Sequence, residues 1–116
     1  MADSCIFCKI AAGELAATVL YEDALLMAIK DAFPATEGHA LIIPKAHAEN
    51  LHDLPEATAA AILPLAQKMA RQMQAALNPA GINILQNNGK AAGQVVFHYH
   101  LHIIPRYDGD SVRIGW

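Results

Sequence analysis

The chain has 116 residues, with 8 lysines and arginines, 11 aspartates and glutamates, and a formal net charge of −3. This length fits one domain, which we expect over residues 1–116, and it is enough to bury about two-thirds of the surface that the unfolded chain exposes. Because the basic residues are scattered, the sequence lacks the positive patch by which proteins bind nucleic acids.

Hydrophobic residues make up 54% of the chain, but alanine supplies much of this fraction. The uncharged stretch 57–67 is too short to cross the hydrocarbon core of a bilayer, which needs about 20 apolar residues. The start, residues 1–5, has neither the basic nor the apolar region of a secretory signal. We therefore expect a soluble cytoplasmic protein without a membrane partner. Its Cys5 and Cys8 would be reduced, and their C-x-x-C spacing favours metal or redox chemistry.

The first elements in chain order are a short helix and three strands. Ser4 can cap the helix, and Gly13 marks its end. The apolar residues of this helix are Ile6, Phe7 and Ile10. Apolar runs bounded by turn residues then predict three strands. They cover residues 18–22, 25–30 and 40–43, with a loop at 31–38.

A long amphipathic helix is predicted over residues 55–77. Its apolar residues at helical spacing are Ile62, Leu65, Met69, Met73 and Leu77. Core packing explains such a stripe, so Met69 and Met73 are assigned to the core. Pro64 lacks a backbone N–H, and we expect it to kink the helix or to split off its first two turns.

Residues 78–81 end this helix, and residues 82–86 alternate as a fourth strand. A polar loop with two glycines follows at 87–94. A two-residue Asn-Gly turn would be enough to reverse the chain, so the longer loop offers backbone N–H groups for a phosphate. The alternative is that Asn88-Gly89 is only a turn signal.

Three histidines stand at strict two-residue spacing, at His98, His100 and His102. In a strand, alternate side chains share a face, so these imidazoles line one face and the apolar residues between them line the other. Neutral imidazole is a nucleophile, an acid or base, and a metal ligand near neutral pH, so the row predicts a reactive centre. The alternative is a solvated strand face that is rich in histidine.

The run from His98 to Ile104 resembles the histidine triad motif, His-φ-His-φ-His-φ-φ with φ apolar, of the histidine triad (HIT) nucleotide-binding superfamily. Other pieces of the likeness follow one another along the chain. They are residues 5–10 with Gly13-Glu14, residues 38–47, Asn87-Asn88-Gly89, Gly93-Gln94 and Pro105-Arg106. Each piece is short, but their order and spacing are specific, and the chain is most similar to the Hint-like branch.

The resemblance implies an α+β protein with the HIT fold, in which a five-stranded antiparallel sheet carries one long helix and a short N-terminal helix. It also implies a homodimer. The three strands before the long helix and the two after it agree with this fold. The implied activity is that of a nucleotidyl hydrolase or transferase acting on purine nucleotide conjugates, such as nucleoside 5'-phosphoramidates, through a covalent nucleotidyl-histidine intermediate.

The resemblance also implies roles for single residues. His100 is the nucleophile that attacks the α-phosphorus, which requires a neutral ring held in one tautomer. His102 contacts the same phosphate, and His98 and His39 complete the catalytic set, with His39 as an orienting residue. The implied nucleotide-binding residues are Asp31 for the ribose, the backbone of Gly93 and Gln94 with Asn87 for the phosphoryl oxygens, and again His100 and His102. Asp31 has an alternative reading, in which it only initiates the loop at Pro34.

One departure from the family pattern concerns Val95. Many Hint relatives have serine or threonine directly after Gly-Gln, where the hydroxyl reaches the phosphate or the leaving group. Valine removes this hydrogen-bond donor, so we expect an effect on rate and leaving-group preference more than on the class of reaction.

The cysteines belong to a second implied site. Cys5, Cys8, His47 and His98 match the zinc ligands of superfamily members that carry C-x-x-C near the start. Two thiolates and two imidazoles make a closed tetrahedral site, so this zinc would be structural. His52 competes with His47 as the third ligand, and His47 has the family spacing after Pro44-Lys45. Without a metal, the two cysteines are small buried apolar residues.

Two other functions stay open at this point. One is a nucleotide-binding or zinc-binding regulatory module whose hydrolysis is incidental, and the other is a diadenosine polyphosphate hydrolase. Purine nucleotide binding with negligible turnover would distinguish the module from the hydrolases. A catalytic metal held by the three triad histidines would require neighbouring residues on one strand face to converge on one ion.

Overall fold

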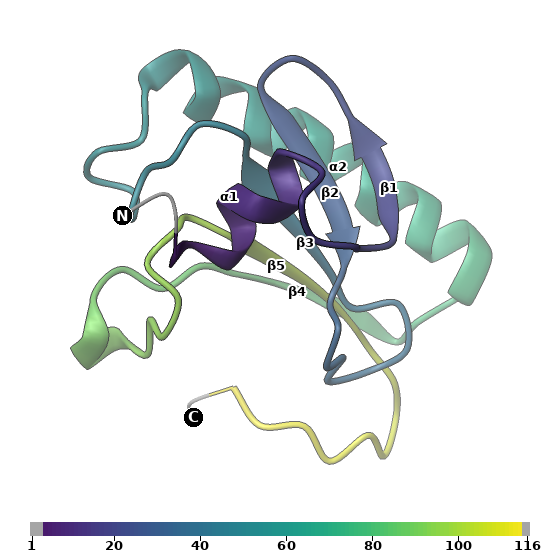
Figure 1. Cartoon of the computed structure of the whole chain (residues 1–116). Helices are drawn as coiled ribbons and strands as arrows, with labels where there is room; N and C mark the ends of the chain where they lie inside the picture. The colour runs from purple at the N-terminus through teal and green to yellow at the C-terminus, as the bar shows by residue number, and fades with distance from the viewer. Residues whose placement is uncertain (1–3, 115–116) are drawn as a thin grey trace.

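The structure is a computed structural model that describes residues 4–114. At its centre lies a five-stranded antiparallel sheet with strand order β1-β2-β3-β5-β4 (Figure 1). The strands are β1 (Val19–Glu22), β2 (Leu26–Lys30), β3 (Ala40–Pro44), β4 (Gly81–Leu85) and β5 (Leu101–Arg106). The predicted α+β class and the five antiparallel strands are confirmed, and β1 to β4 lie within one residue of the predicted bounds.

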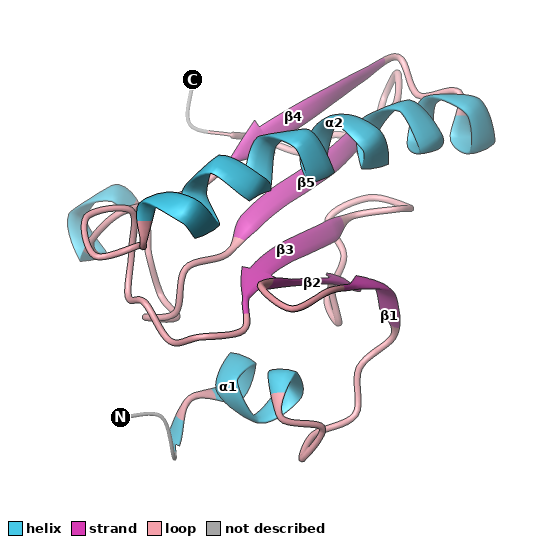
Figure 2. Ribbon diagram, turned by 90° about the horizontal axis from the view of Figure 1, so that it is seen from above, coloured by secondary structure: helices cyan, strands magenta, loops and turns pink. Residues whose placement is uncertain are grey.

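The two helices lie on opposite faces of the sheet (Figure 2). The long helix α2 (Glu56–Leu77) covers one face, and the short helix α1 (Ile6–Ala11) lies on the other. Each face has its own buried cluster. On the α2 side it includes Leu26, Ala28, Ala40, Ile42, Ile62, Leu65, Met69, Leu101 and Ile103. On the α1 side it consists of Phe7, Ile10, Met27, Ile29, Leu41 and Ile43. Successive residues of a strand thus pack alternately into the α2-side and the α1-side core.

The long helix continues through Pro64 from Glu56 to Leu77 without interruption. The prediction that Pro64 splits off the first two turns is therefore wrong. The proline removes the hydrogen bond to the carbonyl of Ala60, but both residues are exposed, so water can solvate that carbonyl. Met69 is buried and Met73 packs against the same core, as predicted. No helix among residues 4–114 is long and apolar enough to cross a bilayer.

The short helix begins one residue later than its predicted cap. Its N-cap is Cys5, not Ser4, and the Cys5 sulfur accepts a hydrogen bond from the backbone N–H of Cys8 at 3.4 Å. Gly13 follows the helix with a φ of +79° and so ends it as predicted. Because Cys5 caps the helix and Cys8 lies in its first turn, the helix geometry holds the two sulfur atoms close together.

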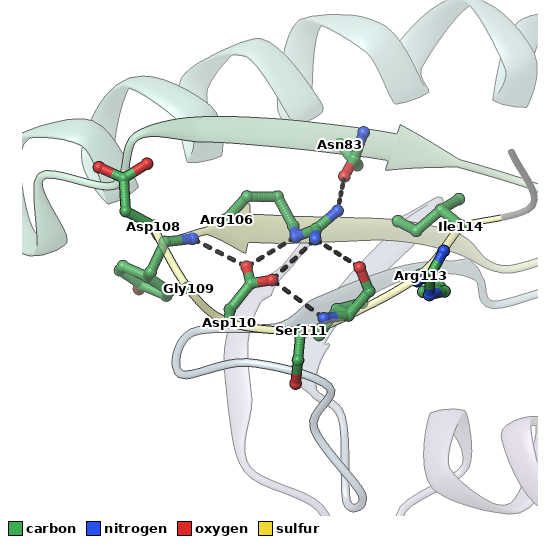
Figure 3. Close-up of a pocket in the computed structure, with 10 residues that line it drawn as sticks. Asn83, Arg106, Asp108, Gly109, Asp110, Ser111, Arg113 and Ile114 are labelled. Atoms are coloured by element: carbon green, nitrogen blue, oxygen red, sulfur yellow. Dashed lines mark hydrogen bonds and ion pairs between the residues drawn. The ribbon is translucent and has the colours of Figure 1, made fainter.

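Arg106, at the end of β5, organises the C-terminal segment. Its guanidinium donates to both carboxylate oxygens of Asp110, to the side-chain oxygen of Asn83 and to the carbonyl of Val112 (Figure 3). The guanidinium and two backbone N–H groups hold the pKa of Asp110 well below its usual range. A cavity of about 650 Å³ lies beside these residues, but no histidine lines it. We therefore assign Arg106 to the fold and not to a phosphate site.

Gly38 lies at the closest approach between the loop after β2, the end of α2 and β5. Its φ is +92°, and a Cβ atom at this position would lie 2.5 Å from Leu77 Cδ1 and 3.2 Å from Pro105 Cγ. The same loop is anchored to β5 by the hydroxyl of Thr36, which donates to the carbonyl of Pro105 at 2.5 Å. Only glycine satisfies both the backbone angle and the lack of space.

Replacing Gly38 by alanine is expected to lower the free energy of unfolding by about 2–4 kcal/mol, because it combines a strained left-handed backbone with overpacking. Urea unfolding followed by circular dichroism measures the change. Gly81→Ala is the matched control, since a Cβ there meets nothing within 4 Å and its φ is not positive. Equal stability of the two variants would contradict this account of Gly38.

Candidate active site and metal centre

The three triad histidines lie on the α1 side of the sheet, at the start of β5. Tyr99, Leu101 and Ile103 point to the α2-side core, whereas the ring of Phe7 on α1 contacts the rings of His98 and His100 at centroid distances of 5.8 and 5.1 Å. The ring centroids of His100 and His102 are 5.0 Å apart. The predicted separation of faces is therefore confirmed.

The predicted strand through all three histidines is wrong at its start. β5 begins at Leu101, so only His102 lies in the strand, while His98 and His100 precede it. The chain leaves the ladder here because the N–H of Tyr99 donates to the carbonyl of Ala48 instead, at 2.7 Å. This irregular backbone also lets the carbonyl of His98 turn toward the ring of His100.

His100 is held in one tautomer by its own chain. Its Nδ1 lies 2.7 Å from the carbonyl oxygen of His98. A carbonyl can only accept, so Nδ1 carries a proton, and in the neutral ring Nε2 keeps its lone pair. The ring is half-buried between the rings of Phe7 and His102. This arrangement presents the Nε2 lone pair of a neutral imidazole, which is what a nucleophile at phosphorus requires.

The hydrogen bond from His39 fixes His102 in the tautomer opposite to that of His100, with its proton on Nε2. The N–H of Ala35 donates to Nδ1 of His39 at 3.0 Å, so His39 carries its proton on Nε2. That Nε2 lies 2.9 Å from Nδ1 of His102 and donates to it, which leaves the proton of His102 on Nε2. Burial, followed by the nearby His100 and His39, lowers the pKa of His102 to about 4. His102 is thus a neutral hydrogen-bond donor at pH 7.

The loop after β4 uses its backbone differently from the expectation. The N–H groups of Gly93 and Gln94 donate to the carbonyls of Lys90 and Gly89, both at 3.0 Å, within and beside the short 3-10 helix η2 (Lys90–Ala92). The expectation that these two N–H groups bind phosphoryl oxygens is therefore corrected, since the loop itself occupies them. Among residues 4–114, no backbone partner faces the N–H of Val95, whose side chain is 84% exposed.

The side chains of this loop mostly hold the loop together. Gln94 is buried, and its amide donates to the carbonyls of Glu49 and Val96 while its oxygen accepts from the N–H of Gly89. Asn87 contacts the carbonyl of Gly93 at 3.4 Å. Gln94 therefore fixes the path of the loop toward the histidines, and Asn87 is the more available of the two side chains.

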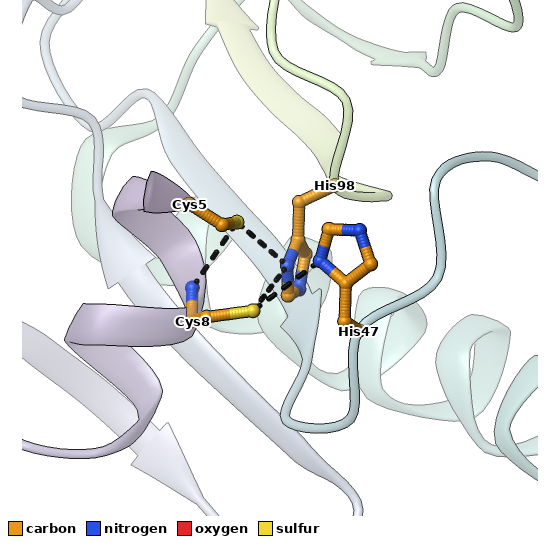
Figure 4. A group of neighbouring side chains, drawn as sticks. All are labelled: Cys5, Cys8, His47 and His98. Atoms are coloured by element: carbon orange, nitrogen blue, oxygen red, sulfur yellow. Dashed lines mark hydrogen bonds between the residues drawn. The ribbon is translucent and has the colours of Figure 1, made fainter. Parts of the chain in front are cut away.

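Four side chains converge beside the triad (Figure 4). The ligand atoms of Cys5, Cys8, His47 and His98 all lie within 4.8 Å of one another. Nδ1 of His98 lies 3.2 Å from the sulfur of Cys5 and 3.5 Å from that of Cys8, and Nδ1 of His47 lies 3.3 Å from the Cys8 sulfur. A tetrahedral zinc ion with these ligands needs separations of about 3.3–3.8 Å. The donor set and its spacing therefore fit zinc.

Hydrogen bonds prepare His98 for this role. The ring is fully buried, and its Nε2 donates to the carbonyl of Pro44 at 2.8 Å, so Nδ1 keeps a lone pair that faces the sulfurs. A second hydrogen bond of this kind is what orients metal-ligating histidines. His52, the competing ligand, is exposed and lies outside the group of four. Burial and then Cys5 raise the pKa of Cys8 to about 11, so a bound cation is needed to keep this sulfur a thiolate.

A second group, Asp31, His39 and His102, is also close enough to surround an ion. Its hydrogen bonds exclude that use. His39 accepts the N–H of Ala35 on Nδ1, so its ring proton must stay on Nε2, the only other ring nitrogen. A metal bound to Nε2 would displace this proton, and the other ring nitrogen, Nδ1, already accepts a hydrogen bond and cannot take it. The group is therefore a hydrogen-bonded relay and not a metal site.

Three partners in this site could not be identified as such from the sequence. Phe7 reads as an ordinary core residue of the first helix, yet its ring touches both His98 and His100. The carbonyl of Pro44 and the N–H of Ala35 are backbone groups, which no side-chain pattern reports. The position of Phe7 between the two cysteines of the C-x-x-C motif is the one clue that places it beside His98.

Comparisons with known proteins agree with this geometry. A model of the HIT domain matches residues 12–109. The chain is 45% identical over 114 residues to the adenosine 5'-monophosphoramidase hnt1 of Schizosaccharomyces pombe, covering 97% of this chain and 83% of that protein.

Two solved structures are also similar. A HIT family protein from Bacillus anthracis matches with a TM-score of 0.95 and 43% identity, covering 100% of this chain and 83% of that one. A zinc-bound histidine triad family protein from Mycobacterium smegmatis matches with a TM-score of 0.89 and 43% identity, covering 97% and 82%. With its fold, its histidine row and these matches, the chain belongs to the HIT family.

Proposed function

We propose that this protein hydrolyses purine nucleoside 5'-phosphoramidates and related nucleotidyl conjugates through a covalent intermediate on His100. The observation that carries the proposal is the hydrogen bond from Nδ1 of His100 to the carbonyl of His98, which leaves Nε2 as a free nucleophile. The similarity to the S. pombe adenosine 5'-monophosphoramidase supports the substrate class.

The reaction takes two displacements at phosphorus. In the first, Nε2 of His100 bonds to the α-phosphorus, the P–N bond to the leaving amine breaks, and the amine departs with a proton from the solvent, to which the water consumed in the second step returns one. In the second, water bonds to phosphorus, the bond to Nε2 breaks, and the nucleoside monophosphate leaves. The net reaction adds one water molecule across the P–N bond. His102 donates its Nε2–H to a phosphoryl oxygen, where negative charge grows in the transition state.

The remaining phosphate and ribose contacts follow from the donors that the fold leaves available. The N–H of Val95 takes the place that we expected for Gly93 and Gln94, and the amide of Asn87 is a further donor nearby in the chain. Asp31 meets the ribose hydroxyls, as the family resemblance implies. The valine at position 95 then retains the backbone donor and lacks only the side-chain hydroxyl.

Zinc is the metal that the second site would hold, through Cys5, Cys8, His47 and His98. A closed site of this kind supplies no reacting water and acts structurally. It would join α1 to the residue whose carbonyl fixes His100, so the local order of the nucleophile would depend on it. The zinc-bound structure from M. smegmatis supports this assignment.

We also propose that the chain forms a homodimer through an apolar patch on α2 and β4. Leu63 is 66% exposed and Ile84 is 45% exposed, and together with Pro64, Ala66, Gln67 and Ala70 they line a cavity of about 420 Å³. Large apolar side chains that a monomer leaves exposed in one patch are typical of an interface.

His100→Ala is expected to lower kcat/KM for adenosine 5'-phosphoramidate by about 10⁴-fold or more, because the nucleophile is lost, while AMP binding stays within about threefold. Product formation by chromatography and AMP titration by calorimetry measure the two effects. His52→Ala is the control, since this exposed histidine lies outside both clusters. A phosphorus-labelled protein adduct that still forms in His100→Ala would refute the assignment, and AMP binding without turnover by the unmodified protein would favour a regulatory module.

Metal analysis of the purified protein is expected to find one zinc ion per chain. Cys5→Ser and His47→Ala should each lose it and lower the free energy of unfolding by at least about 2 kcal/mol, because the free energy of metal binding stabilises only the folded state. Mass spectrometry of the metal and thermal unfolding measure this. His52→Ala should keep the zinc, and the reverse pattern between His47 and His52 would overturn the ligand set.

Leu63→Glu is expected to convert the dimer to a monomer, because it places a charge in the apolar patch. Light scattering after size-exclusion chromatography should show the mass fall from twice the chain mass to 12.4 kDa. Leu51→Glu changes an exposed leucine outside the patch and should leave the mass unchanged. A Leu63→Glu protein of undiminished mass would remove this surface from consideration.

A further inference from the structure

The side chain of Asp31 faces the histidine row before any nucleotide is bound. The β2–β3 ladder ends at the pair Lys30 and Ala40, and the next pair is Asp31 and His39, joined by the Asp31 N–H and the His39 carbonyl at 3.1 Å. This register places the two side chains on the same face of the sheet. The carboxylate oxygen Oδ2 of Asp31 then lies 3.4 Å from Nε2 of His39.

This carboxylate is partly buried and its only ion-pair partner within residues 4–114 is His39, although Lys30 and Lys68 line the same cavity as Asp31. Its side chain is 17% exposed and that of His39 is 6% exposed. The other carboxylate oxygen accepts the N–H of Phe33 at 2.8 Å. Among the ion pairs formed within residues 4–114, none joins Asp31 to a lysine or arginine. Burying a carboxylate beside uncharged histidines is costly, and the turn at Phe33 could be made by an asparagine.

The negative charge of Asp31 lies beside Nε2 of His39, the nitrogen that donates to His102. A carboxylate beside Nε2 favours the tautomer with a proton there and disfavours a lone pair. With that proton, His39 donates to Nδ1 of His102 at 2.9 Å, and His102 keeps its own proton on Nε2. These contacts thus connect Asp31 through His39 to His102, and the ring of His100 lies 5.0 Å from that of His102.

The proposed reaction also creates a positive charge in this row. His100 starts neutral, with a proton on Nδ1, and a bond from Nε2 to phosphorus turns the ring into a cation. We propose that Asp31 is a positioning residue that serves as the counter-charge of the histidine row: its carboxylate adds to the hydrogen bond from the Ala35 N–H in keeping the proton of His39 on Nε2, and it offsets the charge on the nucleotidyl form of His100. This role rests on the proposed function and is separate from a contact with the ribose.

The two roles of Asp31 can be separated with substrates. Asp31→Asn keeps the shape and the turn at Phe33 but removes the charge. The ring centroids of His39 and His102 are 5.2 Å apart and those of His102 and His100 are 5.0 Å apart, so the charges are separated by on the order of 10 Å. At that separation Coulomb's law with an effective dielectric constant between about 20 and 80 gives a change of about 2- to 20-fold in rate. We expect this loss in kcat for adenosine 5'-phosphoramidate and equally for its 2',3'-dideoxy analogue, which has no ribose hydroxyls. Any increase in KM should be confined to the ribose substrate.

An unchanged kcat for the dideoxy analogue in Asp31→Asn would overturn the proposal and leave Asp31 with the ribose alone. Asp31→Glu keeps the charge and should retain kcat within about threefold. Glu37→Gln is the matched control, because it neutralises an exposed carboxylate of the same loop that forms no ion pair with a histidine of residues 4–114. Circular dichroism confirms that each variant is folded.

A measurement without substrate tests the same proposal independently of turnover. Nitrogen-15 NMR of the histidine rings should show His39 and His102 protonated on Nε2 in the unmodified protein, with shifted tautomer populations in Asp31→Asn and not in Glu37→Gln. Unchanged ring signals in Asp31→Asn would overturn the positioning role. If the unmodified protein hydrolyses neither substrate, the proposed function fails, and the NMR comparison still decides whether Asp31 sets the tautomers.

Discussion

The hydrogen bonds of His98 are the interaction on which the rest of this site depends. Its ring donates to the carbonyl of Pro44 at the end of β3, which frees the other nitrogen to face Cys5 and Cys8. Its own carbonyl accepts from His100 and fixes the tautomer of that ring. One fully buried residue thus connects the sheet, the short helix and the nucleophile. A different orientation of its ring or carbonyl would break the contacts with all three.

Burial favours the neutral form of His39, His98 and His102. His39, His98 and His100 each donate a ring hydrogen bond to a defined acceptor, and burial lowers the pKa of His39, His98 and His102. A neutral row suits nucleophilic attack, since a protonated imidazole has no lone pair. The same desolvation strengthens the effect of any fixed charge nearby, which is why a single carboxylate at Asp31 matters here.

Much of the fold could be read from local patterns, and the failures have local physical reasons. Strands β1 to β4 and helix α2 follow from apolar periodicity bounded by turn residues. The sequence does not show that Ala60 and Pro64 both face water, which is why the helix tolerates its proline. It also does not show that Tyr99 bonds to Ala48, which delays the start of β5 to Leu101. In both cases a tertiary contact or exposure overrides a local rule.

The sequence by itself determined the class of chemistry, because the spacing of His98, His100 and His102 and the C-x-x-C pair depend only on which residues are present and in what order. The tertiary structure decided the choice of His47 over His52 in the cluster, the tautomer of each ring and the use of the Gly93 and Gln94 N–H groups. These depend on distances between segments far apart in the chain and on the direction of backbone carbonyls, which no side-chain pattern encodes.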